Sequence, residues 1–257
     1  TPVAKYIYQT ATQHGKRVQA AGGAKNFMVV LPDADLDSTI EAIIGSAYGC
    51  AGERCMAGSV LVCAEEAEKR FLSPLEDATR ALRVGPTDRD ANTQMGPLIT
   101  RQHLDRVCTY IAKGKAEGAD LRVDGRNFHV KETPNGFYLG PTLFDHVTPK
   151  MQISKDEIFG PVLATMRTKE LDKAINYCNN SGYGNAAVLF TQSGGAARQF
   201  RHRVRAGMVG INIGVPAPMA FFPFSGWNNS FFGDLHVQGQ EGIAFFTHQK
   251  VTISRWE

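Results

Sequence analysis

The sequence predicts an α/β fold in which a mainly parallel β-sheet is flanked by helices. Apolar runs of strand length alternate along the chain with segments whose apolar residues recur at helical spacing. The chain has 257 residues, of which 43% are hydrophobic, so it can bury a sizeable core as one large domain or two small ones. Strand alternating with helix is typical of a parallel sheet wound with helices.

The helices are expected where apolar residues recur at intervals of three and four. Pro2 is tolerated in a first turn, and Gly15 and Gly118 fit as helix stops. The expected helices cover residues 1–14, 35–48, 65–82, 100–117, 171–179 and 195–204.

The strands are expected at short apolar runs bounded by turn residues. The clearest run, residues 27–31, is ended by Pro32 and Asp33. The other expected strands cover residues 59–62, 121–123, 137–139, 142–144, 161–166, 186–190 and 208–213, with a terminal strand segment at 245–246 and 251–253.

Charge and composition argue against several classes of partner. The net charge is only +3, and the one concentrated basic run, residues 198–205, lacks interleaved aromatic residues. We interpret that run as the solvated face of a helix and expect no nucleic-acid partner. No apolar run of about 18 residues occurs, so no membrane span is expected. The histidines lack metal-ligand spacing and there is no Cys-x-x-Cys pair, so no metal site is expected.

The most distinctive stretch is the Gly- and Ala-rich turn that contains Cys55. Small residues allow close approach of a substrate, and the preceding Arg54 favours the thiolate, which is the nucleophilic form of cysteine. Cys55 is therefore a candidate for covalent catalysis, the alternative being an inert, packed cysteine. An odd number of cysteines argues for a reducing compartment. The other four are expected to pack: Cys50, Cys63, Cys108 and Cys178.

Four ordered motifs resemble the aldehyde dehydrogenase superfamily. They are the Cys55 turn with residues 60–62, the segment 23–26 with 31–35, the segment 157–162, and the segment 223–227. The chain is most similar to the CoA-acylating methylmalonate-semialdehyde dehydrogenases of that superfamily. This narrower resemblance is carried by Arg54 directly before Cys55, by the lead-in at residues 16–20 and by residues 231–234.

The resemblance implies a division of the chain, because the superfamily's enzymes are roughly twice as long. Residues 1–30 would be the tail of the Rossmann-like NAD-binding domain, 31–240 the catalytic domain, and 241–257 a C-terminal strand used in oligomerisation. No complete Gly-x-Gly-x-x-Gly fingerprint is present. The implied setting is a homodimer or homotetramer in the bacterial cytoplasm, or alternatively the mitochondrial matrix.

The resemblance also implies roles for individual residues. Cys55 would form a thioester with a semialdehyde substrate, and NAD would be the cofactor. Glu157 would accept hydrogen bonds from its ribose hydroxyls, Phe159 would brace the nicotinamide, and backbone near Gly22 would face the same ring. From the residues alone, Glu157 and Phe159 read as a helix-turn acid and a core aromatic side chain.

One departure from the superfamily pattern concerns Ala21. Most members place a glutamate four residues before the lysine of their Gly-Gly-Lys stretch, as general base on water; Ala21 stands there in this chain. General base catalysis is typically worth about 10²–10⁴-fold, so a thioester at Cys55 should hydrolyse slowly. A thiol such as that of CoA needs less help than water. The expected product is therefore an acyl-CoA, with CoA as co-substrate.

Arg54 has two interpretations. Its planar guanidinium suits a carboxylate, which favours a substrate that carries its own carboxylate. Alternatively, Arg54 pairs with Glu53 or another acid and only lowers the pKa of the thiol. Two further hypotheses for the whole chain stay open: a hydrolytic dehydrogenase for another acidic semialdehyde, and a non-catalytic fragment without its NAD domain.

Overall fold

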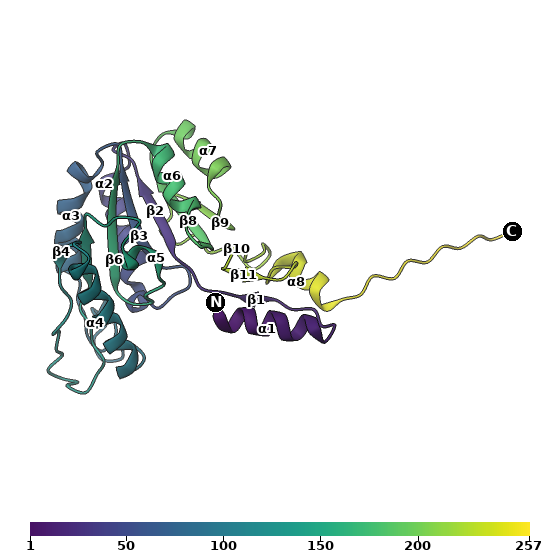
Figure 1. Cartoon of the computed structure of the whole chain (residues 1–257), viewed down its shortest axis with the longest axis horizontal. Coiled ribbons are helices and arrows are strands. Elements are labelled where there is room, and N and C mark those ends of the chain that lie inside the picture. Colours follow the sequence, from purple (N-terminus) through teal and green to yellow (C-terminus); the bar gives the residue numbers. More distant parts are fainter.

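The computed structural model describes residues 1–257, and its centre is a seven-stranded sheet (Figure 1). All neighbouring strands are parallel except the edge pair β4 and β5, which confirms the expected α/β fold with a mainly parallel sheet. The strands lie in the order β4 (Asp120–Val123), β5 (Thr142–Asp145), β6 (Val162–Thr168), β3 (Gly58–Ala64), β2 (Asn26–Val30), β8 (Ala186–Phe190) and β9 (Met208–Ile211).

The central strands are continuous apolar runs because both of their faces are buried. Every residue of β2 and of β8 is buried, and β3 has only one partly exposed position. A half-exposed strand would alternate apolar with polar residues, and a parallel strand covered on both faces does not. The apolar runs of the sequence therefore predicted the strands at the centre of the sheet.

Helices cover both faces of the sheet (Figure 1). From β2 the chain crosses to β3 in one direction, and from β6 it crosses back to β8 in the opposite direction. Because such crossovers are right-handed, the connecting helices α2 and α6 lie on opposite faces. The main helices of this domain are α2 (Leu36–Tyr48), α3 (Glu68–Arg80), α4 (Arg101–Ala116), α6 (Leu171–Asn179) and α7 (Gly194–Arg203), with the short α5 at Gln152–Lys155.

A smaller group of elements lies beside the sheet and joins the two ends of the chain. Helix α1 (Pro2–Gln13) packs on β1 (Ala20–Ala21), which pairs with β11 (Phe231–Phe232). A second two-stranded pair joins β7 (Tyr183–Gly184) to β10 (Trp227–Asn228). The short helix α8 (Gly239–Phe246) completes this group (Figure 1).

Three expectations need correction. Strand β2 lies at the centre of the large sheet, so residues 26–30 belong with that sheet and not with the segment 1–30. Residues 137–139 form no strand. Phe245 and Phe246 end a helix where a strand was expected. Residues 247–257 extend away from the body, and the expected use of the C-terminal segment in oligomerisation stays a prediction (Figure 1). A strand needs a partner, and β-propensity alone does not supply one.

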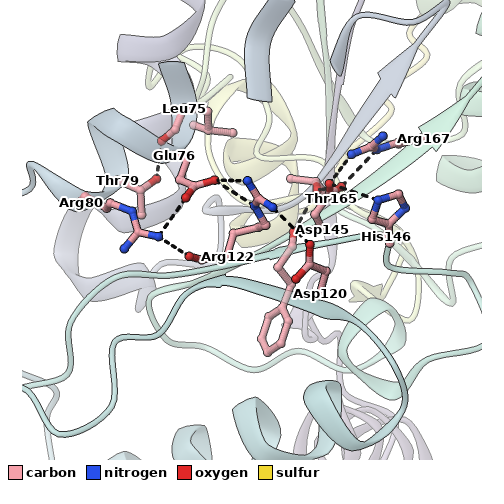
Figure 2. Close-up of polar contacts among 11 residues, drawn as sticks. Leu75, Glu76, Thr79, Arg80, Asp120, Arg122, Asp145, His146, Thr165 and Arg167 are labelled. Carbon is pink, nitrogen blue, oxygen red and sulfur yellow. Dashed lines mark hydrogen bonds and ion pairs between the residues drawn. The ribbon is translucent and has the colours of Figure 1, made fainter. Parts of the chain in front are cut away.

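Two polar clusters hold the β4–β5 edge (Figure 2). Glu76 on α3 accepts hydrogen bonds from Arg80 and from Arg122 on β4. Asp145, which is 2% exposed, accepts from the Thr165 hydroxyl at 2.8 Å and from the Arg167 guanidinium. Buried charge is tolerated here because its hydrogen bonds are made. No helix of the chain is both long and apolar enough to cross a membrane.

Candidate active site

The predicted nucleophile lies at the edge of the sheet where the parallel strands begin. Cys55 stands between a 3₁₀ turn, η1 (Gly49–Gly52), and the start of β3. The segment that carries Glu157 leads into β6, Asn26 opens β2, and Asn185 directly precedes β8. Because parallel strands share one amino edge, these four stretches, far apart in sequence, converge there.

Two buried asparagines fix the backbone of Cys55. The Asn26 and Asn185 side-chain amides each donate to the Cys55 carbonyl oxygen at 2.9 Å. Asn26 also donates to the Ala57 carbonyl at 2.9 Å and accepts from the Ala186 N–H. The amide N–H of Cys55 donates to no acceptor in the chain. The turn is thus held by its carbonyl, while its N–H is free to stabilise an oxyanion.

The turn that leads to Cys55 has an unusual backbone. Cys50 and Ala51 adopt positive φ angles of 53° and 52°, and Gly52 follows at 69°. Such conformations cost free energy in non-glycine residues and are found at functional sites. Cys50 is exposed, so the expectation that it packs is wrong; Cys63 and Cys178 are buried as expected, and Cys108 is partly buried. Cys55 itself is exposed, which contradicts the inert, packed alternative.

Arg54 binds the end of helix α2. Its guanidinium donates to the Gly45 and Ser46 carbonyls, the latter at 3.0 Å, where the helix dipole is negative. It forms no ion pair with Glu53, which instead lies 3.5 Å from the His103 ring. Arg54 Nε is buried without a hydrogen-bond partner. The pairing with Glu53 is therefore wrong for this structure, and part of the guanidinium is left without an acceptor.

Helix α4 holds the segment 156–159. Tyr110 donates to the Asp156 carboxylate at 2.9 Å, and Arg106 donates to the Glu157 and Ile158 carbonyls at 3.0 and 2.9 Å. His103 Nε2 donates to the carbonyl of Phe159, whose φ is +61°. The three donors follow one another along one face of the helix, at intervals of three and four residues. The loop is thus fixed by its main chain and by the Asp156 carboxylate, and none of these three donors uses the Glu157 or Phe159 side chain.

The structure brings four of the five predicted site residues together. Arg54, Cys55, Glu157 and Phe159 line one narrow cavity, and Phe159 is 38% exposed. Burial raises the pKa of Glu157, against the lowering effect of the Ala24 N–H. Gly22 is not part of this cavity: its N–H donates to the Ser230 carbonyl at 2.8 Å.

Asn26, Asn185 and the α4 donors were not singled out from the sequence. A signal for the asparagines exists, because each is a polar residue at the start of an apolar strand, and such residues meet at the amino edge of a parallel sheet. The α4 donors carry no comparable signal, since Arg and His on an amphipathic helix usually face water.

The comparisons with known proteins concern the family and the fold of the chain. The model of the aldehyde dehydrogenase family matches residues 1–252. Malonate-semialdehyde dehydrogenases from Oceanobacillus iheyensis and Halalkalibacterium halodurans are 51% and 50% identical over 255 residues, 99% of this chain and 52% of each relative. A crystal structure described as a putative methylmalonate-semialdehyde dehydrogenase from Sinorhizobium meliloti complexed with NAD superposes with a TM-score of 0.96. It is 45% identical, and the match covers all of this chain and 52% of that one.

A more distant structure, the betaine aldehyde dehydrogenase of Staphylococcus aureus in complex with NAD+, has a TM-score of 0.89 at 28% identity, covering 95% of this chain and 48% of that one. The chain thus spans about half the length of these relatives. The family match covers nearly the whole chain, and the predicted resemblance is confirmed: the chain belongs to the aldehyde dehydrogenase family.

Proposed function

We propose that this chain carries the nucleophile of an NAD-dependent, CoA-acylating semialdehyde dehydrogenase acting on malonate or methylmalonate semialdehyde. The observation that carries the proposal is the exposed Cys55, whose carbonyl is held by Asn26 and Asn185 and whose N–H is free. The names of relatives about half identical to the chain support the substrate class.

Cys55 begins the reaction. Its thiolate attacks the aldehyde carbon, and the resulting oxyanion accepts a hydrogen bond from the Cys55 N–H. NAD, when bound, supplies the acceptor for the hydride that leaves the substrate carbon. The acyl group then remains on Cys55 Sγ as a thioester. A second oxyanion donor is expected from the part of the relatives' length that this chain does not span.

Arg54 is proposed to hold the substrate's own carboxylate. Arg54 lines the same cavity as Cys55, and its Nε is buried without a protein acceptor. A charge-assisted bond from this group would place the aldehyde carbon over Sγ. The carbonyls of α2 fix the guanidinium on its other side, so the side chain is ordered before substrate arrives.

Glu157 and Phe159 fit the ribose and nicotinamide of NAD. The Glu157 carboxylate lies against the backbone of Gly23 and Ala24, and a β-carbon added to Gly23 would stand 2.5 Å from its Oε2. An ionised carboxylate is a strong acceptor for two neighbouring hydroxyl groups. Phe159 presents a partly exposed ring at the same cavity. The backbone near Gly22, whose N–H donates to the Ser230 carbonyl, is proposed to face the nicotinamide.

The transfer of the acyl group to CoA rests on Ala21. No acidic residue occurs among residues 1–22, so this segment offers no general base for water. The CoA thiolate attacks the thioester carbon and Cys55 leaves as thiolate. The carboxylate β to the acyl carbonyl departs as CO2, and protonation of the remaining carbon gives acetyl-CoA or propanoyl-CoA.

The test is NADH formation by the complete protein with malonate semialdehyde, with and without CoA, and with Cys55→Ala as control. We expect strong CoA dependence that disappears in the variant. Equal turnover without CoA, with release of a free acid, would favour a hydrolytic dehydrogenase and would contradict the argument from Ala21.

A further inference from the structure

Lys25 is a buried cation without a hydrogen bond. Its side chain is 3% exposed and its Nζ has no partner. The buried Asp145 is the opposite case, because Thr165 and Arg167 donate hydrogen bonds to its carboxylate (Figure 2). An unpaired buried ammonium group is expensive and calls for an explanation.

The acids next to Lys25 belong to the candidate active site. Gly23 lies against Glu157, since a β-carbon added to Gly23 would stand 2.5 Å from Glu157 Oε2. The Asp156 carboxylate, and to a smaller extent the Glu157 carboxylate, favours the charged form of Lys25. Asp156 already accepts a hydrogen bond from Tyr110. Glu157 is the acid whose side chain faces the cavity.

Three other titratable groups lie near Glu157. Arg106 uses its guanidinium on the Glu157 and Ile158 carbonyls. The amino group of Thr1, the first residue of this chain, acts on Glu157 more strongly than Lys25 does, and burial raises the pKa of the Tyr183 phenol. Lys25 is the buried side-chain cation that acts on Glu157 without a hydrogen bond of its own.

We propose that Lys25 is a positioning residue, whose buried ammonium group keeps the Glu157 carboxylate ionised and turned toward Gly23 and Ala24, ready to accept hydrogen bonds from the cofactor's ribose. This rests on the proposed role of Glu157. Burial opposes both charges: it raises the pKa of Glu157 and lowers the pKa of Lys25 to about 7, while each charge favours the other. Without Lys25, Glu157 would take up a proton at a higher pH and would lose acceptor capacity there.

The first test uses the complete protein without cofactor. Lysine side chains labelled with ¹³C at Cε are titrated by NMR, and the Lys25 signal is identified by its loss in Lys25→Met. We expect a midpoint near 7, which falls by about half a unit or more in Glu157→Gln. A midpoint in the ordinary lysine range, or one unchanged in Glu157→Gln, would overturn the proposal.

The second test measures NAD affinity of the complete protein against pH by calorimetry. We expect Lys25→Met to bind NAD more weakly at acidic pH, by up to about tenfold for a shift of one pKa unit at Glu157, and to recover near pH 8.5. Lys25→Arg should follow the wild type because it keeps the cation. Lys155→Met, which removes an exposed lysine beside Asp156, is the matched control and should change nothing.

A loss of affinity that is equal at all pH values would show a structural role only and would contradict the proposal. If Glu157→Gln binds NAD normally, the proposed role of Glu157 fails instead, and the NMR titration still decides whether Lys25 and Glu157 are coupled. Thermal melts of each variant identify any that does not fold.

Discussion

Gly52 lies directly against the carbonyl oxygen of Gly160, so the turn before Cys55 and the segment after Glu157 meet backbone to backbone. A β-carbon on Gly52 would collide with that oxygen, and Gly52 has a φ of +69° that disfavours any side chain. Gly160 in turn packs on Val107 of α4, which a β-carbon would approach to 2.7 Å. This contact fixes the distance between the nucleophile and the proposed cofactor-binding side chains.

Gly52→Ala is therefore expected to destabilise the chain by about 1–3 kcal/mol through its backbone conformation, before the collision is counted. Urea unfolding measures the loss of stability, and the rate of NADH formation measures the effect on activity. Gly45→Ala, on helix α2 with open space around its α-carbon, is the control and should not destabilise. Equal stability of both variants would show that the two loops are not in contact.

Asn26→Ala should lower both stability and activity, because it leaves the Ala57 carbonyl without a donor, the Ala186 N–H without its acceptor and the Cys55 carbonyl with Asn185 alone. We expect about 1–3 kcal/mol for each buried group left unsatisfied, and a slower, less uniform alkylation of Cys55 by iodoacetamide. Asn212→Ala is the matched control, since Asn212 also makes two bonds to backbone but at the carboxyl ends of β8 and β9. Loss of Cys55 reactivity in both variants would refute a specific role of Asn26.

Arg106→Ala should loosen the segment that carries Glu157 without touching Cys55. Two hydrogen bonds to carbonyls are lost, and we expect KM for NAD to rise by about tenfold, which corresponds to about 1.4 kcal/mol. The alkylation rate of Cys55 should stay unchanged. Arg101→Ala, on the same helix but over the Phe137 ring, is the control. An unchanged KM in Arg106→Ala would mean that α4 does not order the loop.

Lys25→Met should stabilise the chain near neutral pH and remove a pH dependence. The pKa of Lys25 is about 7 when folded against 10.5 in its ordinary state. Between these two pH values Lys25 is protonated in the unfolded chain and neutral in the folded one. The free energy of unfolding therefore rises with pH from 7 to about 10, and the contribution of Lys25 to stability is lowest below pH 7. We expect a gain on the order of a few kcal/mol at pH 7 in Lys25→Met, with a flatter profile.

Urea unfolding at several pH values from 6 to 10 measures this, with Lys155→Met as the control. A wild-type profile without the rise above pH 7 would contradict the burial of an unpaired Lys25. Greater stability with weaker NAD binding in one variant would separate the proposed function of this lysine from a structural one.

The sequence predicted the central strands well, and the reason is physical. Residues 27–31 and 186–190 are apolar throughout because both faces of the sheet are covered, and their helices follow the 3.6-residue period. The two-residue strands β1, β7, β10 and β11 depend on partners far away in sequence, which no local pattern encodes. Phe245 and Phe246 have high β-propensity, yet they end a helix whose last carbonyls are bound by Arg17.

The site was predictable only in part for a similar reason. Arg54 and Cys55 stand in a turn that the sequence itself makes distinctive. The resemblance to the superfamily implied that Glu157 and Phe159 belong to the same site, and all four residues line one cavity. The support beneath Cys55 was missed because Asn185 donates to a carbonyl 130 positions away. Gly22 lies against the β10–β11 turn, a long-range contact that no sequence motif predicts, and its place beside the cofactor stays a prediction.

The most direct test of the account is to trap the acyl group. The complete protein is incubated with NAD and malonate semialdehyde without CoA, digested at acidic pH, and analysed by peptide mass spectrometry. We predict an acyl group on the peptide of Cys55, lost on brief addition of CoA and absent in Cys55→Ala. An acyl group on the exposed Cys50, or NADH formation with no acylated cysteine, would contradict the assignment of Cys55 as the nucleophile.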